Sequence, residues 1–190
     1  MQVFPERFLK NVGSSSIEKN VVHCIIKLQD VDGKEKSMLY LMIAAVVFTL
    51  DFGIKHHIDK KFRIKEQHIC KKNKIILEKY YNDGAALGFL AKKPGLMKGI
   101  HTIMIVVVGV FFYILLRTPG KELAKTGMAL LLGGGANNLY DRYAKGHVVD
   151  YFRINMGPKR LKRIIFNISD FCVFIGALLA AVGAGQNSNL

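Results

Sequence analysis

Two aspartates at the edges of apolar stretches are the best candidates for chemistry in this sequence. Asp150 ends residues 133–150, where a glycine run is followed by two asparagines, an Asp-Arg pair and this second aspartate. Asp170 ends residues 166–170 (FNISD), which open another apolar stretch. Carboxylates are costly to bury at the edges of membrane-length segments, so a functional site is the first interpretation. A helix terminus with a satisfied aspartate cap is the alternative.

Two aspartates held close together can act as a general acid and a general base. Like charges at short range cannot both ionise, so one carboxyl stays protonated and polarises a carbonyl while the other takes a proton from water. Neither a Ser/His/Asp set nor a Cys/His pair accompanies them. We therefore predict that Asp150 and Asp170 are the reacting pair. The adjacent Asp141 and Arg142 are interpreted as an ion pair that fixes a loop.

The cysteines and glycines give no indication of a metal or nucleotide site. Cys24, Cys70 and Cys172 are widely spaced, so neither a disulfide framework nor a zinc site is predicted. The sequence has no P-loop and no dinucleotide fingerprint, and residues 133–135 (GGG) are more typical of close helix packing.

The composition favours a membrane protein. Of 190 residues, 51% are hydrophobic, and 28 Lys and Arg face 14 Asp and Glu. Such a balance suits either a nucleic-acid binder or a membrane protein with basic loops. Because long apolar runs alternate with basic stretches here, we favour the membrane protein and expect no nucleic-acid partner.

Four apolar segments predict an all-α membrane fold, a bundle of four transmembrane helices. They comprise residues 38–54, 100–116, 126–139 and 164–185. The third segment is rich in glycine and is expected to pack inside the bundle. A basic segment follows at residues 55–79, and its later part, residues 75–81, alternates in polarity and is predicted to form a strand. A basic loop is expected after the third segment.

The first 37 residues are polar, mixed in charge and without a predicted span. We therefore divide the chain into an N-terminal extension, residues 1–37, and a four-span membrane domain, residues 38–190. The apolar run begins at Met38 itself, so a natural start at this methionine is one explanation. A small cytoplasmic strand or tail is the other.

The polar clusters all fall at one face of the predicted membrane domain. Four successive crossings alternate in direction, which places the following residues at the same side: Asp51, Asn82, Asn137, Asn138, Asp141, Arg142, Asp150, Asn167 and Asp170. We therefore predict one composite site at a membrane surface. The loops of this face carry most of the Lys and Arg, so the positive-inside rule alone would assign it to the cytoplasm.

Five short blocks of sequence carry a resemblance to a known family. They are Asp51-x-x-x-Lys55, Asn82-x-Gly84-Ala85-Ala86, Asn138-Leu139-Tyr140-Asp141-Arg142, His147-Val148-Val149-Asp150 and Phe166-Asn167-x-x-Asp170. In order, spacing and four-span frame they resemble signal peptidase II, the lipoprotein signal peptidase family of bacteria. The resemblance covers about residues 38–185.

The resemblance implies an aspartic endopeptidase with Asp150 and Asp170 as its catalytic residues. It assigns substrate-binding or supporting roles to Asn82, Gly84, Asn138, Asp141, Arg142, Asn167, Asp51 and Lys55. Residues 71–89 would form a small extracytoplasmic β-cradle. The implied reaction is hydrolysis just before a diacylglyceryl-modified cysteine of a prolipoprotein, without metal or cofactor. The implied setting is a monomer among phospholipids of the bacterial inner membrane, with its site on the extracytoplasmic side.

Three positions depart from the family pattern, and two other functions stay open. Asn137 stands where glycine is common, Ser169 where alanine is usual, and Phe52 where glutamine is frequent. A small membrane transporter would place carboxylates near the middle of several spans, whereas here they collect at one end. An inactive or divergent member of the family is the third interpretation.

Overall fold

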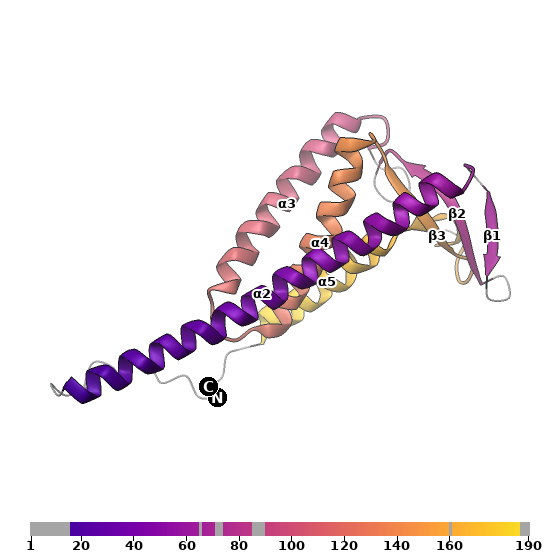
Figure 1. Cartoon of the computed structure of the whole chain (residues 1–190). Coiled ribbons are helices and arrows are strands. Elements are labelled where there is room, and N and C mark those ends of the chain that lie inside the picture. Colours follow the sequence, from indigo (N-terminus) through magenta and orange to yellow (C-terminus); the bar gives the residue numbers. More distant parts are fainter. Residues whose placement is uncertain (1–15, 65, 71–73, 85–89, 160, 187–190) are drawn as a thin grey trace.

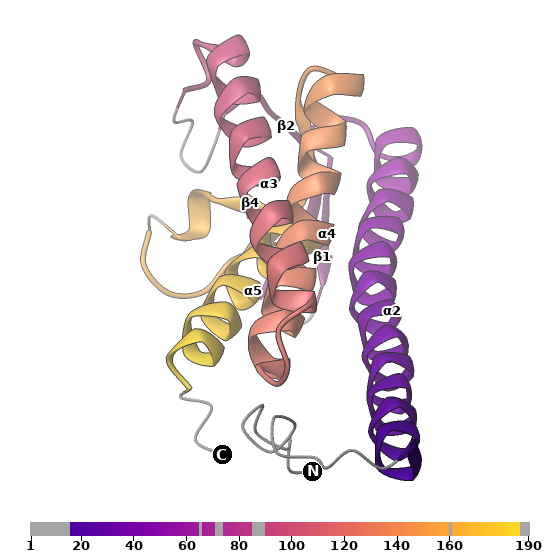
Figure 2. The same ribbon diagram turned by 90° about the vertical axis from the view of Figure 1, so that its left-hand side faces the viewer.

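Four helices form the body of the protein in the computed structural model, which describes residues 16–64, 66–70, 74–84, 90–159 and 161–186. They are α2 (Ser16–Lys61), α3 (Pro94–Leu116), α4 (Glu122–Ala144) and α5 (Ile168–Gly185). Helix α4 packs against each of the other three, and it lies between α2 on one side and α3 and α5 on the other (Figure 2).

A small antiparallel sheet closes one end of the helix bundle (Figure 1). Its strands lie in the order β1 (Gln67–Cys70), β2 (Ile75–Asn82), β3 (Val148–Ile154) and β4 (Ile165–Phe166). Strand β3 follows α4 after a short turn, and β4 leads directly into α5. The sheet therefore joins the ends of these two helices and fixes where their terminal side chains lie.

Among the described residues, three helical segments are long and apolar enough to cross a membrane: residues Glu35–Lys61 of α2, α3 and α5. Most of their apolar side chains face outward, among them Val106, Phe111 and Phe174, as expected for lipid-facing surfaces. Helix α4 does not meet this criterion, because it carries glycines, asparagines and charged residues that are buried against its neighbours. The mostly helical membrane fold and the small sheet are confirmed, while a fourth crossing stays a prediction.

Glycines bring α4 and α5 into backbone contact, as predicted for residues 133–135. A Cβ atom added at Gly134 would lie 2.6 Å from the Ser169 carbonyl oxygen. Farther along the same interface, a Cβ at Gly176 would lie 2.6 Å from the Gly127 carbonyl oxygen. Side chains at these positions would force the helices apart. The close approach places the end of α4 beside the beginning of α5, where the candidate residues lie.

Several boundaries differ from the sequence-based prediction. The third segment is longer, so Asp141 and Arg142 lie within α4 and not in a loop. Residues 148–154, expected as a loop, form β3, and the fourth helix begins only at Ile168 because residues 165–166 belong to β4. Strand β2 confirms the prediction for residues 75–81. Residues 71–73 and 85–89 of the expected cradle lie outside the described residues.

Helix α2 crosses the predicted domain boundary at position 38 without a break. Residues 16–37 form its N-terminal part, which extends beyond the other helices (Figure 1). A strand in this segment is therefore wrong for residues 16–37, whereas residues 1–15 lie outside the described part of the chain. A start at Met38 stays a prediction.

Candidate active site

Asp150 is held by two amide side chains on the face of β3 that points away from the apolar cluster of the sheet. Its neighbours Val149 and Tyr151 pack with Ile58 in that cluster, so the alternation of the strand turns Asp150 to the opposite face. Asn82 Nδ2 donates to Asp150 Oδ2 at 2.9 Å, and Asn167 Nδ2 donates to Asp150 Oδ1 at 2.7 Å. Burial and the nearby Asp170 carboxylate raise the pKa of Asp150 to about 7.

Asp170 lies in the first turn of α5 and belongs to a capping box. Its backbone N–H donates to Asn167 Oδ1 at 2.9 Å, and its Oδ2 accepts from the Asn167 backbone N–H at 3.0 Å. The helix-cap interpretation is therefore correct for this residue. Its second oxygen, Oδ1, accepts from Asn138 Nδ2 at 2.9 Å. Both oxygens are thus engaged, and the capping geometry fixes the carboxylate in place.

Asn167 connects the two aspartates. Its buried side chain donates to Asp150 through Nδ2 and accepts from the Asp170 backbone through Oδ1. An amide uses both of its ends in this arrangement, so it cannot rotate without breaking a contact to one of the two residues. Asn167 therefore sets the position of one carboxylate relative to the other.

Lys55 supports Asp170 from behind through Asn138. Its Nζ donates to Asn138 Oδ1 at 2.6 Å, which turns the amide nitrogen of Asn138 toward Asp170. The same ammonium lies 3.1 Å from Asp51 Oδ2 and 3.1 Å from Asp141 Oδ2. An ammonium has three N–H donors, and three acceptors surround this one in a buried site.

The prediction that Asp141 pairs with Arg142 is wrong. In the described part of the chain, Asp141 forms ion pairs with Lys55 and with Lys145, the latter at 3.0 Å. Its Oδ2 also accepts from the Val149 backbone N–H at 3.4 Å. Adjacent residues of a helix point in different directions, so the two side chains of α4 serve different neighbours. Asp141 therefore links the C-terminal end of α4 to Lys55 of α2 and to Val149 of β3.

Arg142 ties the turn after β2 to the helix bundle. Its Nη2 donates to the Gly84 carbonyl at 2.6 Å, and its Nη1 donates to the Asn138 carbonyl at 3.2 Å. Nη1 also lies 3.4 Å from His101 Nδ1, which accepts because a guanidinium has only donors. Gly84 in turn donates its N–H to Asn82 Oδ1 at 3.1 Å. This series of contacts thus links Arg142, through Gly84, to the Asn82 side chain that donates to Asp150.

The sequence-based prediction did not assign roles to His101 and Tyr151. Tyr151 OH donates to Asp51 Oδ1 at 2.7 Å and accepts from the Ile168 backbone N–H at 3.2 Å. The sequence could have indicated a role for Tyr151 through its position next to Asp150 in a strand, but that strand was not predicted. His101 is a single polar residue near the start of an apolar helix, which is a weak indication without the contact to Arg142.

A cavity of about 970 Å³ contains both aspartates. Its polar end is lined by Asn82, Asn138, Arg142, Asp150 and Asp170. Its apolar wall comes from α3 and α5 and includes Met97, Ile100, Met104, Val173, Phe174 and Ala177. Because these two helices also present apolar side chains to the outside, the cavity suits a ligand with one polar and one apolar part.

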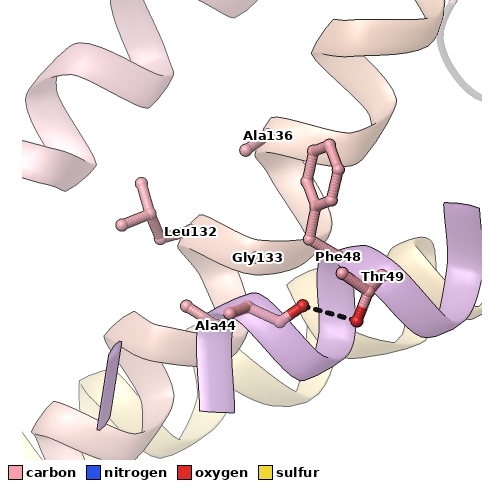
Figure 3. A pocket seen from close by; sticks show the side chains of 7 residues that line it. Ala44, Phe48, Thr49, Leu132, Gly133 and Ala136 are labelled. Atoms are coloured by element: carbon pink, nitrogen blue, oxygen red, sulfur yellow. Dashed lines mark hydrogen bonds between the residues drawn. The ribbon is translucent and has the colours of Figure 1, made fainter. Parts of the chain in front are cut away.

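A second hollow, of about 340 Å³, lies between α2 and α4 and is lined by apolar and small residues (Figure 3). Phe48 and Leu132 border it, and Gly133 permits the close approach of α2. Thr49 also lines the hollow, and its hydroxyl Oγ1 donates to the Ala45 carbonyl of the same helix at 2.9 Å. None of the described residues that line this hollow is titratable, so the candidate chemistry lies in the larger cavity.

The described residues include no group of three His, Cys, Asp or Glu side chains placed to hold a metal ion. The two aspartates accept hydrogen bonds from amide and backbone N–H groups. This donor set stabilises carboxylates without a cation. The expectation that the protein needs no metal or cofactor stays a prediction.

The fold and the site together define a membrane protein with an acidic pair at one end of its helix bundle. The same fold occurs in a bacterial membrane enzyme solved by the in meso method at 2.3 Å resolution, with a TM-score of 0.66 and 21% sequence identity. That similarity covers 80% of this chain and 94% of the solved chain.

Sequence comparison identifies the family. The profile described as Signal peptidase (SPase) II matches residues 43–184. A lipoprotein signal peptidase of Janthinobacterium sp. (strain Marseille) is 37% identical over 147 residues, which cover 75% of this chain and 86% of the relative. One of Cupriavidus taiwanensis is 34% identical over 152 residues, or 79% and 84% of the two chains. The chain belongs to the signal peptidase II family, so the transporter interpretation is not favoured.

Proposed function

We propose that this protein cleaves the signal peptide from diacylglyceryl-modified prolipoproteins, with Asp150 and Asp170 as its catalytic pair. The observation that carries the proposal is the joint placement of the two carboxylates by Asn167, at the polar end of a cavity with an apolar wall. Family membership supports the peptidase activity and the prolipoprotein substrates. The aspartic mechanism and the individual roles below are our inference from the geometry.

In the proposed reaction, Asp170 is the base and Asp150 is the acid. Asp170 takes one proton from a water molecule as the water oxygen attacks the carbonyl carbon of the scissile bond. Asp150, whose pKa is raised to about 7, donates its proton to the carbonyl oxygen. When the tetrahedral intermediate collapses, Asp170 donates its proton to the leaving nitrogen and the C–N bond breaks. Asp150 takes the proton of one hydroxyl group as the carbonyl re-forms, so that both carboxyls return to their starting forms.

The cavity matches the two chemical parts of such a substrate. The signal peptide and the diacylglyceryl group are apolar, and they would lie along α3 and α5, beside Met104 and Phe174. The peptide bond to be cut needs polar partners, which Asn82 and Arg142 supply near the aspartates. A substrate that arrives within the bilayer can therefore reach the polar end of the cavity without leaving its apolar surroundings.

We also propose that α4 is the fourth crossing of the membrane. At about 1.5 Å per residue, its 23 residues extend roughly 35 Å, which is enough to cross the hydrocarbon core. Its low hydropathy is consistent with this role because α2, α3 and α5 surround it. Four crossings would place both ends of the chain on the side opposite the sheet, and the site would face the extracytoplasmic side.

The test is prolipoprotein cleavage by purified Asp150→Asn, Asp170→Asn and the double variant in detergent. Because the pair acts as a unit, each single change should lower kcat by about 1000-fold or more, nearly as much as the double change. Asp59→Asn is the matched control: Asp59 is bound by Tyr81 and Lys79 at the same end of the bundle, outside the cavity lining. Substantial turnover by either single variant, in correctly folded protein, contradicts the assignment.

A further inference from the structure

Asp51 lies beneath the catalytic pair and collects hydrogen bonds from three elements of the fold. Tyr151 OH of β3 donates to its Oδ1 at 2.7 Å. Its Oδ2 accepts from Asn137 Nδ2 of α4 at 3.1 Å and from Ser169 Oγ of α5 at 2.5 Å, and lies 3.1 Å from Lys55 Nζ. The Ser169 backbone N–H adds a longer contact at 3.3 Å. Asp51 is 0% exposed, so these donors replace all of its solvation.

Two of these donors, Asn137 of α4 and Ser169 of α5, act through side-chain groups that a glycine or an alanine would lack. Both side chains are fully buried and reach the same oxygen from different helices. Asn137 also donates to the Phe48 carbonyl at 3.2 Å, while its own Oδ1 has no partner among the described residues. Its function here is therefore that of a donor.

We propose that Asn137 and Ser169 are a matched pair of positioning residues that act on the catalytic site through Asp51 and Lys55. They share the stabilisation of the Asp51 carboxylate with Lys55, so that Lys55 keeps its short contact to Asn138. Asn138 in turn holds Asp170. The inference deepens the proposed function and rests on it, since it assumes that Asp170 is catalytic.

The geometry explains why losing these donors would reach Asp170. Without Asn137 and Ser169, Asp51 Oδ2 would keep only the Lys55 ammonium and the long contact to a backbone N–H. A buried carboxylate with too few donors draws the nearest cation toward itself. Lys55 would then move away from Asn138 Oδ1, now 2.6 Å away. The amide of Asn138 would be free to turn, and its 2.9 Å contact to Asp170 would loosen.

The effect should appear in kcat and not in KM. Of the described residues that line the larger cavity, none is Asp51, Lys55, Asn137 or Ser169. These residues therefore have no direct contact with a substrate bound there. A change in this group alters the placement of Asp170 and leaves the apolar wall and the Arg142 contacts unchanged.

The experiment compares Asn137→Gly, Ser169→Ala and the double variant in prolipoprotein cleavage, with kcat expressed per folded enzyme. Losing one buried hydrogen bond should lower kcat about three- to tenfold, with KM unchanged. The two donors share one oxygen, so each partly compensates for the loss of the other. The double variant should therefore lose more than the product of the two single effects. Asn137→Asp, which replaces the donor by an acceptor of the same shape, should lose more than Asn137→Gly.

Thr49→Val is the matched control, because the Thr49 hydroxyl bonds only within its own helix in the described structure. It should leave kcat unchanged. The proposal is overturned if the single and double variants keep the parent kcat while Asp150→Asn and Asp170→Asn are inactive. It is also overturned if KM rises at constant kcat, or if the two effects simply multiply. Activity retained in the aspartate variants would instead refute the proposed catalytic pair.

Discussion

At the scale of single residues, burial, Asp170 and two amide side chains act in opposite directions on the protonation of Asp150. Asn82 and Asn167 each donate one N–H to a different oxygen of Asp150. Both contacts favour the ionised form of Asp150, whereas burial and Asp170 favour the protonated form. The second pair of effects is larger, and the pKa of Asp150 is raised to about 7. A small change in either amide should therefore be visible near neutral pH.

The pH dependence of cleavage should show the titration of Asp150. If the protonated carboxyl is the acid, kcat/KM falls as the pH rises above about 7, where Asp150 loses its proton. Asn82→Asp replaces the N–H donor, now 2.9 Å from Asp150 Oδ2, by an oxygen. This disfavours the ionised form, raises the pKa of Asp150, and should move the alkaline limb to higher pH. Asn155→Asp, outside the cavity lining, is the control.

An unmoved alkaline limb in Asn82→Asp, or one displaced to lower pH, would contradict the assignment of Asp150 as the acid.

The stability of the protein should also depend on the protonation of Asp150, and the direction of this dependence can be stated. Because the folded-state pKa is raised, the folded protein holds the proton over a range in which the unfolded chain has lost it. The contribution of Asp150 to stability therefore declines as the pH rises from its ordinary pKa range toward 7.

At the scale of elements, the sequence predicts segments whose polarity repeats regularly. It misses segments without such a repeat and very short ones. Residues 75–81 alternate in polarity, and β2 follows. Strand β3 was missed because Val148 and Val149 are both buried, which removes the alternation, and β4 has only two residues. Those two residues are apolar and precede α5 directly, so the sequence pattern does not separate them from the helix.

The candidate site was predictable to the extent that its residues lie at the ends of elements. Counting crossings was enough to bring Asp150 and Asp170 to one end, where the structure places both in one cavity. Contacts between partners could not be predicted, because they depend on the rotation of each helix. Asp141 and Arg142 are neighbours in sequence and yet bind different groups, Lys55 and Gly84. Likewise, nothing in the sequence indicated that Asn137 and Ser169 meet at Asp51.

The contact between α4 and α5 should be sensitive to a single methyl group. A Cβ at Gly176 would lie 2.6 Å from the Gly127 carbonyl oxygen and 2.8 Å from the Leu131 nitrogen, both backbone atoms. Gly176→Ala should therefore destabilise the protein by about 1–3 kcal/mol, the usual cost of overpacking. Gly109→Ala in α3 is the matched control, since no atom lies within 4 Å of its added Cβ. It should be neutral or slightly stabilising.

Thermal unfolding of both glycine variants in the same detergent measures this difference. Equal midpoints for Gly176→Ala and Gly109→Ala would show that α4 and α5 can separate at little cost. Because the same interface places Asn138 beside Asp170, a loss of cleavage that parallels the loss of stability in Gly176→Ala is expected.

At the scale of the whole molecule, the polar and the apolar parts are separated along the bundle. The sheet lies at one end and the loop that joins α3 to α4 at the other (Figure 1). The acidic pair lies beside the sheet, and so do the buried charges of Asp51, Lys55 and Asp141, since Asp51 and Asp141 accept hydrogen bonds from β3 and Lys55 pairs with both. The outward faces of α2, α3 and α5 between the ends are apolar. This separation indicates how the bundle lies across a bilayer. It does not decide which side of the membrane the sheet end faces.

The orientation prediction is that the sheet end faces the extracytoplasmic side. A peptidase that acts on prolipoproteins after their export must present its site there, even though basic residues such as Lys159 and Arg163 lie at this end. The positive-inside rule is a bias that counts residues near the ends of spans and does not fix the side by itself. On the outer surface, these side chains would lie against anionic lipid headgroups.

Cysteine labelling in intact cells decides between the two sides. Single cysteines are placed at Met156, which is 45% exposed beside β3, and at Thr118, which is exposed in the loop between α3 and α4. The background carries serine at the three native cysteines and must first be shown to cleave substrate. An impermeant thiol reagent should label position 156 in intact cells and position 118 only after lysis. The reverse pattern would place the acidic pair in the cytoplasm, where an exported prolipoprotein could not reach it.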